Sequence, residues 1–290
     1  MLVFYSLDTL ERLVNAQTFF MDGTLSVAPH PFKQLYTIRV PFKDVTGTAV
    51  YAFLPNKCQD TYRELFQSIV DNCHASNLQL NVQTIITDFE DAVLRAVTAV
   101  FGRHINHQGC FYHLTQVSWR KIQQLGLVPL YNNDDDFRLF CGMMEGLAFL
   151  PVPDFTNGIH HLLRKPCPDD PPEAAELLDY FDSTYISAQN QAVRLVLRCI
   201  PPMFPPAIWS VHDATVNGDA RTNNMCEGWN KFFNLVGHAH PSIWRVIEWC
   251  QKEETTVRTI IQQDAVGYPP VKRTQQRHVQ LQERLQNHIS

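Results

Sequence analysis

Three short runs rich in β-branched and aromatic residues follow one another within the first 54 residues, with turn-forming residues between them. Such runs predict strands, and their short spacing predicts an antiparallel meander. The runs are Gln17–Met21, which continues into Asp-Gly-Thr, then Gln34–Val40 and Thr48–Leu54. A short helix is expected before them, over residues 8–16. The chain is therefore expected to begin with a sheet.

The spacing of the apolar residues changes after residue 60. Between Tyr62 and Cys73 they recur at helical intervals. The segment Val82–Thr87 is typical of a compact strand, and a helix over 92–101, a short strand-like run over 107–113 and a helix over 114–125 follow it. The order β-β-β-α-β-α-β-α predicts the first part of an α/β core over residues 1–125.

The middle of the chain, residues 126–220, has mostly helical spacing and predicts an all-helical insertion. The candidate helices are Phe137–Leu147, Phe155–Leu163, Glu173–Phe181 and Gln189–Leu197. Residues 221–263 predict two helices, about Asn224–Val236 and Ser242–Gln263, which complete the core. The polar stretch 264–290, rich in Gln and Arg, is expected to be a loosely held tail.

The composition narrows the classes of protein. Hydrophobic residues make up 45% and charged residues 18% of the chain, which excludes wholesale disorder. A formal net charge of −5 argues against a protein that coats nucleic acid through bulk electrostatics. No apolar run approaches the ~18 residues of a membrane span. Eight dispersed cysteines without a secretion signal favour an intracellular protein with reduced thiols.

Two aspartates follow strand-like runs. Asp22 comes at the end of the first run and Asp88 follows Thr87. An acid in that position points to the edge of a sheet, where α/β proteins hold ligands. The two are 66 residues apart in the sequence and share one site only if their strands are neighbours. Taken singly, each is more often a turn residue or a helix N-cap.

A third acid, Glu227, lies in the run Arg-Thr-Asn-Asn-Met-Cys-Glu-Gly-Trp-Asn that begins at Arg221. Stabilisation of a helix N-terminus is the ordinary role of such a glutamate. Two Asp and one Glu also form the ligand set of metal-assisted phosphoryl transfer, in which two divalent ions stabilise the attacking and leaving oxygens. Magnesium prefers such hard oxygen ligands. The three acids therefore predict a catalytic site that holds two Mg²⁺ or Mn²⁺ ions.

An ordered set of motifs resembles the catalytic domain of MULE (Mutator-like element) transposases, which are DDE enzymes of the RNase H-like superfamily. The motifs are Phe-Met-Asp-Gly-Thr at 20–24, Gln-Leu-Tyr-Thr-Ile at 34–38, Thr-Asp-Phe-Glu at 87–90, Gly-Cys-Phe-Tyr-His at 109–113, Trp-Arg-Lys-Ile at 119–122, Leu-Ala-Phe-Leu-Pro at 147–151, Arg-Thr-Asn-Asn at 221–224 and Glu-Gly-Trp at 227–229. The resemblance implies an RNase H-like core with a mixed sheet and a helical insertion before the last catalytic helix. It assigns catalysis and Mg²⁺ binding to Asp22, Asp88 and Glu227.

The same resemblance implies an activity and partners. The activity is DNA strand cleavage and transfer on transposon ends and target DNA, in the nucleus, without a small-molecule substrate or a membrane. A homo-oligomer is a further expectation. Because no zinc-finger pattern for recognising DNA occurs here, the chain is expected to be truncated. A catalytically silent, domesticated domain that binds DNA or protein is the alternative, and a host nuclease for RNA–DNA hybrids is a more distant one.

Two further groups of residues have less specific patterns. Cys110 and His113 form the family's CxxH element and half of a tetrahedral zinc site, which His238 and His240 would have to complete. A packed cysteine beside a hydrogen-bonded histidine is the ordinary alternative. The second group is expected to contact DNA if it is functional, and helix-core packing or solvation is its ordinary role. That group is Trp119, Arg120, Lys121 and Arg221.

Overall fold

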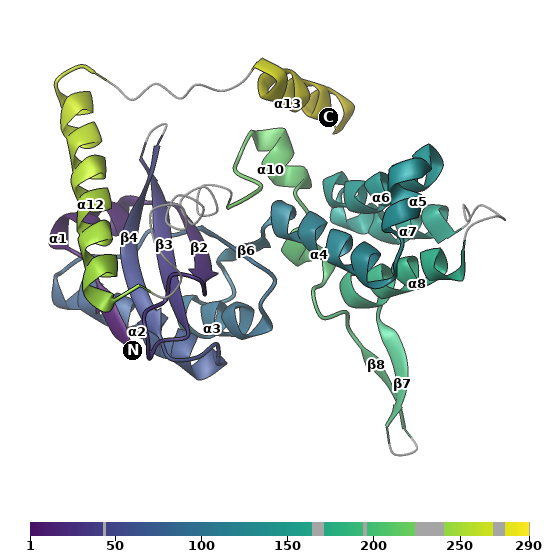
Figure 1. The fold of residues 1–290 in the computed structure, drawn as a ribbon, viewed down its shortest axis with the longest axis horizontal. Coiled ribbons are helices and arrows are strands. Elements are labelled where there is room, and N and C mark those ends of the chain that lie inside the picture. Colours follow the sequence, from purple (N-terminus) through teal and green to yellow (C-terminus); the bar gives the residue numbers. More distant parts are fainter. Residues whose placement is uncertain (43–44, 164–170, 194–195, 224–240, 269–275, 290) are drawn as a thin grey trace. The chain divides into compact units, whose positions relative to one another are not determined.

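The computed structural model describes residues 1–42, 45–163, 171–193, 196–223, 241–268 and 276–289 (Figure 1). The chain divides into two compact units. The first unit comprises Met1–His107 and Asn223–Thr274, and the second comprises Gln108–Thr222 and Gln275–Ser290. The predicted helix over 224–236, the segment that carries Glu227, lies outside the described residues.

A six-stranded mixed sheet forms the centre of the first unit, in the order β1-β4-β3-β2-β5-β6. The strands are β1 (Leu2–Phe4), β2 (Thr18–Thr24), β3 (Gln34–Phe42), β4 (Val45–Leu54), β5 (Thr84–Thr87) and β6 (Asn106–Gly109). The predicted meander is confirmed, because β3 pairs antiparallel with both β2 and β4. Strand β1, which the sequence did not predict, pairs antiparallel with β4.

Alternate residues of the strands face two different layers of helices. Tyr36 and Ile38 of β3 pack in a core with α1 (Leu7–Asn15), α2 (Gln59–Ala75) and α3 (Asp91–Phe101). Leu35 of β3 packs on the opposite face with Val246, Trp249 and Cys250 of α12 (Ile243–Ala265). This alternation follows from the two-residue period of a strand. The sheet of the first unit is therefore covered on both faces.

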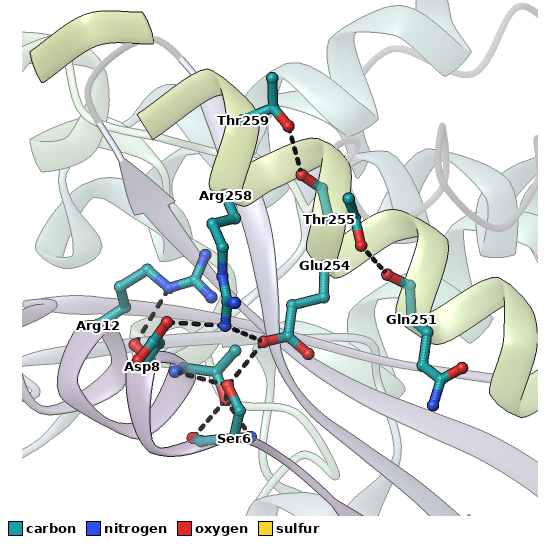
Figure 2. A network of polar contacts seen from close by, with 9 residues as sticks. Ser6, Asp8, Arg12, Gln251, Glu254, Thr255, Arg258 and Thr259 are labelled. Atoms are coloured by element: carbon teal, nitrogen blue, oxygen red, sulfur yellow. Dashed lines mark hydrogen bonds and ion pairs between the residues drawn. The ribbon is translucent and has the colours of Figure 1, made fainter. Parts of the chain in front are cut away.

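Helix α12 begins where the sequence predicted, since the Ser242 side chain accepts a hydrogen bond from Arg245 N at its N-terminus. It is also tied to the start of α1 (Figure 2). Ser6 Oγ donates to Glu254 Oε1 at 2.7 Å, and Arg258 forms an ion pair with Asp8 at 2.8 Å. These contacts join segments almost 250 residues apart in the sequence.

The second unit is mainly helical. Its helices are α4 (Phe111–Gln124), α5 (Val128–Asn133), α6 (Asp135–Gly146), α7 (Phe155–Leu163), α8 (Pro172–Phe181), α9 (Pro206–Trp209), α10 (His212–Asn217) and α13 (Gln276–Ile289). Its core surrounds the fully buried Trp209, which stacks on Phe155 at 4.7 Å between ring centroids. The indole Nε1 of Trp209 donates to the carbonyls of Tyr185 and Phe204. The predicted helices that start near 137, 155 and 173 are confirmed as α6, α7 and α8.

One prediction for this unit is wrong. The segment Gln189–Leu197 is not helical, because β7 (Gln189–Val193) and β8 (Val196–Ile200) form an antiparallel hairpin that extends away from the helices of the unit (Figure 1). Its β-branched valines favour the strand. In the C-terminal stretch, Gln282 and Gln286 of α13 donate to the Thr215 carbonyl at 3.2 Å. No helix among the described residues is long and apolar enough to cross a membrane.

Candidate active site

Asp22 and Asp88 lie in register at neighbouring parallel strands. The register of β2 with β5 pairs Thr18 with Thr84, Phe19 with Ile85 and Phe20 with Ile86. Each aspartate comes two residues after the last of these pairs, so the two occupy equivalent positions along adjacent strands. Neighbouring strands are about 4.8 Å apart. The structure therefore brings the two acids together.

Asp22 differs from expectation in one respect, because it lies inside a strand. Strand β2 continues to Thr24, and Asp22 pairs with Thr37 of β3. Its side chain is buried, and its Oδ1 accepts a hydrogen bond from Gly23 N at 2.8 Å. A buried carboxylate is stable only where hydrogen bonds or positive charge compensate for lost hydration. The Gly23 amide supplies part of that compensation, and a divalent cation would supply more.

The backbone at Asp88 is fixed by a buried pair of polar side chains. Thr87 Oγ1 donates to the Asp88 carbonyl at 2.9 Å and lies 2.9 Å from His107 Nε2. Burial lowers the pKa of His107 to about 4, so this imidazole is neutral at pH 7. Since the threonine proton goes to the carbonyl, the neutral His107 donates from Nε2 to the hydroxyl oxygen. Both residues thereby position Asp88 without adding charge to the site.

Glu90 is held by two side chains instead of being a solvated acid at a helix start. Tyr62 Oη donates to Glu90 Oε1 at 2.8 Å, and Lys57 Nζ pairs with Oε2 at 2.9 Å. Gln34 Nε2 in turn donates to Tyr62 Oη at 2.6 Å. Asp91, the next acid, is more exposed and pairs with Arg95 within α3. No pattern in the sequence signals that Gln34 and Tyr62 contact Glu90 in this way.

A buried tyrosine of β3 has a pKa that the charge of the same acids affects. Burial is the main cause that raises the pKa of Tyr36 well above its ordinary value, and the negative charges of Asp88, Asp22 and Glu90 add to it, as does neighbouring Tyr62. The Tyr36 hydroxyl therefore stays protonated. Among the residues that the structure describes, none forms a hydrogen bond with this hydroxyl.

Asn223 brings the start of the third acidic motif to the strand of Asp22. Its buried side chain donates from Nδ2 to the carbonyl of Met21 at 3.3 Å. Glu227 follows four residues later in the sequence and lies outside the described residues. Within the described part of the chain, no group of three or more His, Cys, Asp or Glu side chains is placed to hold a metal ion. The structure thus describes two of the three acids, and their role as metal ligands stays a prediction.

Cys110 and His113 both lie at the N-terminus of α4 in the second unit. Cys110 is the buried N-cap, and His113 falls in the first turn, not after a strand as expected. Since His238 and His240 lie outside the described residues, the zinc site stays a prediction.

The predicted DNA-contacting residues all have partners within the second unit. Trp119 packs edge-on against Tyr131, and Arg120 bonds to Gln116. Lys121 pairs with Glu176 at 3.0 Å and lies over the Tyr180 ring. Arg221 lies 5.6 Å from the Phe149 ring centroid, and burial lowers the pKa of its guanidinium. These contacts are those of packed side chains, and DNA binding by the four residues stays a prediction.

The first unit is thus a mixed α/β domain in which Asp22 lies in β2 and Asp88 directly follows the neighbouring parallel strand β5. Residues 5–117 match the family model of the MULE transposase domain. The matched region contains Asp22, Asp88, Cys110 and His113 but ends before Glu227. No curated protein matches the chain significantly.

Proposed function

We propose that the chain catalyses divalent-metal-dependent DNA cleavage and strand transfer, as a DDE transposase domain with an RNase H-like core. The observation that carries this proposal is the in-register placement of Asp22 and Asp88 on β2 and β5, within the matched MULE region. Three antiparallel strands followed by helix, strand, helix and strand also agree with the element order expected for that core.

Asp22, Asp88 and Glu227 would hold the metal ions. Carboxylate oxygens are the ligands that Mg²⁺ and Mn²⁺ prefer, and the burial of Asp22 suits a bound cation. When bound, two such ions supply electrostatic stabilisation of the attacking and leaving oxygens at the scissile phosphate. Thr87 and His107 hold the Asp88 backbone in place. Asn223 anchors the segment that leads to Glu227 beside Asp22.

The substrate in this proposal is DNA, namely the ends of a mobile element and its target, and the site of action is the nucleus. A silent DNA- or protein-binding domain is the second candidate. The internal contacts of Lys121 and Arg221 favour its protein-binding form, because they occupy two cations that could otherwise bind phosphate. The two candidates differ in whether the acids bind cations and cleave DNA.

The test is Mn²⁺-dependent nicking of supercoiled plasmid by the purified chain. Asp22→Asn, Asp88→Asn and Glu227→Gln are expected to abolish nicking. Asp60→Asn is the matched control, because Asp60 is an exposed acid of α2 that pairs only loosely with Arg63, at 3.6 Å. It is expected to nick as well as the unaltered chain. Nicking that persists in Asp88→Asn would overturn the proposal.

Cation binding supplies a second readout that does not depend on DNA recognition. A cation at about 100 times its Kd stabilises a folded protein by about 2.7 kcal/mol, so Mn²⁺ is expected to raise the Tm of the first unit. The increase is expected to disappear in Asp88→Asn and to remain in Asp60→Asn. A Tm that does not respond to Mn²⁺ would favour the silent domain instead.

A further inference from the structure

Trp244 lies in the first turn of α12 and is 75% exposed. The other tryptophans that the structure describes, Trp119, Trp209 and Trp249, are partly or fully buried. Burial is the usual state of this side chain, because its ring is large and apolar. An isolated exposed apolar residue is nevertheless common on protein surfaces, so exposure alone assigns no function. The place of Trp244 relative to the candidate acids supplies the further evidence.

Helix α12 covers the face of the sheet that carries Asp22. Asp22 pairs with Thr37 across β2 and β3. Leu35 lies two residues before Thr37 on the same strand, so all three residues share one face of the sheet. Leu35 packs in one cluster with Val246 of α12. The helix that begins beside Trp244 therefore lies over the face of the candidate site.

The direction of α12 places its first turn at the carboxyl end of β2. Near the start of the helix, Val246 packs with Leu35, which pairs with Thr24, the last residue of β2. Further along the helix, Glu253 bonds to Arg39, towards the opposite end of β3. In Figure 1 the arrowhead of β2 points to the end of the sheet at which α12 begins. The first turn of α12 and the candidate acids thus lie at the same edge of the sheet.

Two segments at this edge contain cations and no acidic residues. They are the β2–β3 loop, residues 25–33, which packs on α12 through the same cluster, and residues 241–247 at the start of the helix. Lys33 and Arg245 are both exposed, and neither forms an ion pair within the described part of the chain. The Arg245 guanidinium lies 5.4 Å from the centroid of the Trp249 ring. In a chain with a net charge of −5, this edge is therefore a local site for an anionic ligand.

An exposed aromatic ring beside cations has the chemistry of a single-strand binding surface, on which bases stack while phosphates contact the cations. We propose that Trp244 stacks on an unpaired DNA base and that Lys33 and Arg245 contact the adjoining phosphates. A ring stacks only on a base whose face is free, so the ligand is single-stranded DNA and not an intact duplex. The base would lie at the edge of the sheet that holds Asp22 and Asp88. This inference rests on the proposed function for the choice of DNA as ligand, but stacking itself needs no metal ion.

The experiment measures binding of a fluorescein-labelled oligothymidylate to the full chain by fluorescence anisotropy in EDTA. Stacking of one base on an aromatic side chain contributes a factor of about 5–100 in affinity, so Trp244→Ala is expected to bind at least about fivefold more weakly. Trp244→Phe keeps a ring and is expected to retain most of the affinity. Tyr268→Ala is the matched control, because Tyr268 is also 75% exposed but follows the other end of α12. It is expected to bind like the unaltered chain.

An intact duplex separates stacking from charge, because it offers phosphates while its bases stay stacked on one another. Trp244→Ala is expected to leave duplex binding unchanged. Arg245→Gln is expected to weaken the binding of both forms of DNA and to lower the slope of log affinity against log salt by about 1. An equal loss of single-strand and duplex binding in Trp244→Ala would refute stacking on a base.

The remaining outcomes separate this inference from the proposed function. If the unaltered chain does not bind the oligothymidylate, or Trp244→Ala binds it equally well, the inference is refuted, while metal-dependent nicking lost in Asp88→Asn would still support the proposed function. If Trp244→Ala changes the oligomeric state in sedimentation but not the affinity for DNA, the ring contacts a second copy of the chain and the inference is also refuted. If only Trp244→Ala loses single-strand binding while Asp88→Asn still nicks DNA, the proposed function fails and the stacking contact is supported.

Discussion

Glu253 connects α12 to the sheet through a buried carboxylate, and its replacement by alanine is the sharpest test of that packing. Its oxygens accept hydrogen bonds from Arg39 Nη1 at 2.8 Å, from Thr48 Oγ1 at 2.8 Å and from Tyr51 Oη. The side chains of the ion pair are 6% exposed for Arg39 and 14% exposed for Glu253. Solvent therefore screens this pair only weakly.

The expected loss is large because one partner of a buried pair is removed and the other remains. Breaking such a pair costs about 3–5 kcal/mol. We expect Glu253→Ala to lower the free energy of unfolding of the first unit by that amount. Glu253→Gln is expected to cost less, about 1.5–3 kcal/mol, because the amide oxygen still accepts hydrogen bonds while the charge-assisted bond to Arg39 is lost.

The adjacent residue gives a matched control on the same helix. Glu254 accepts from Ser6 Oγ and pairs with Arg258, which is half exposed (Figure 2). Exposed pairs contribute about 0–1 kcal/mol, so Glu254→Ala is expected to change stability by no more than that. Hydrogen exchange of α12 peptides, read by mass spectrometry, gives the opening free energy of this helix directly. Equal losses for Glu253→Ala and Glu254→Ala would refute the reasoning.

Three further predictions concern buried groups. Burial lowers the pKa of His107 to about 4, so the unfolded chain binds a proton before the folded chain does as pH falls below about 6.5. The free energy of unfolding should therefore fall by up to about 3 kcal/mol between pH 6.5 and pH 4, and His107→Gln should flatten this part of a curve of stability against pH. Gly23→Ala should lower the free energy of unfolding by about 1–3 kcal/mol through overpacking, whereas Gly142→Ala, with open space around it, should raise it. Trp209→Ala should cost about 3–5 kcal/mol in a denaturant titration of the second unit.

The parts of the fold that local patterns determine could be predicted from the sequence. Alternating β-branched residues gave the meander, and helical spacing gave α7 with the bounds Phe155–Leu163 that the structure has. Strand β1 was missed because three residues carry no periodicity, and its pairing with β4 is a contact across some 50 residues. The β7–β8 hairpin was missed because a short apolar run fits helix and strand equally until its pairing is known.

In the candidate site, too, features that follow from local patterns could be predicted, whereas those that depend on tertiary contacts could not. The placement of Asp88 after a strand could be predicted, because an acid that interrupts an apolar run is visible in the sequence, whereas β2 continues past Asp22 to Thr24. The packing of Gln34 and Tyr36 over Gly23 could not, since it depends on which strand lies beside β3 and on the missing side chain of Gly23. A glutamine and a tyrosine in a strand have no pattern that distinguishes a site from a core.

The register of β2 and β5 explains how core packing places the two carboxylates. Phe19 pairs with Ile85 and Phe20 with Ile86, and all four side chains are buried. Successive residues of a strand face opposite layers, so a slip of one residue would turn Ile85 and Ile86 to the wrong layers. The same slip would move Asp88 away from Asp22. The apolar pairs therefore set the distance between the acids, and conservative changes at Ile85 or Ile86 are expected to weaken cation binding as well as stability.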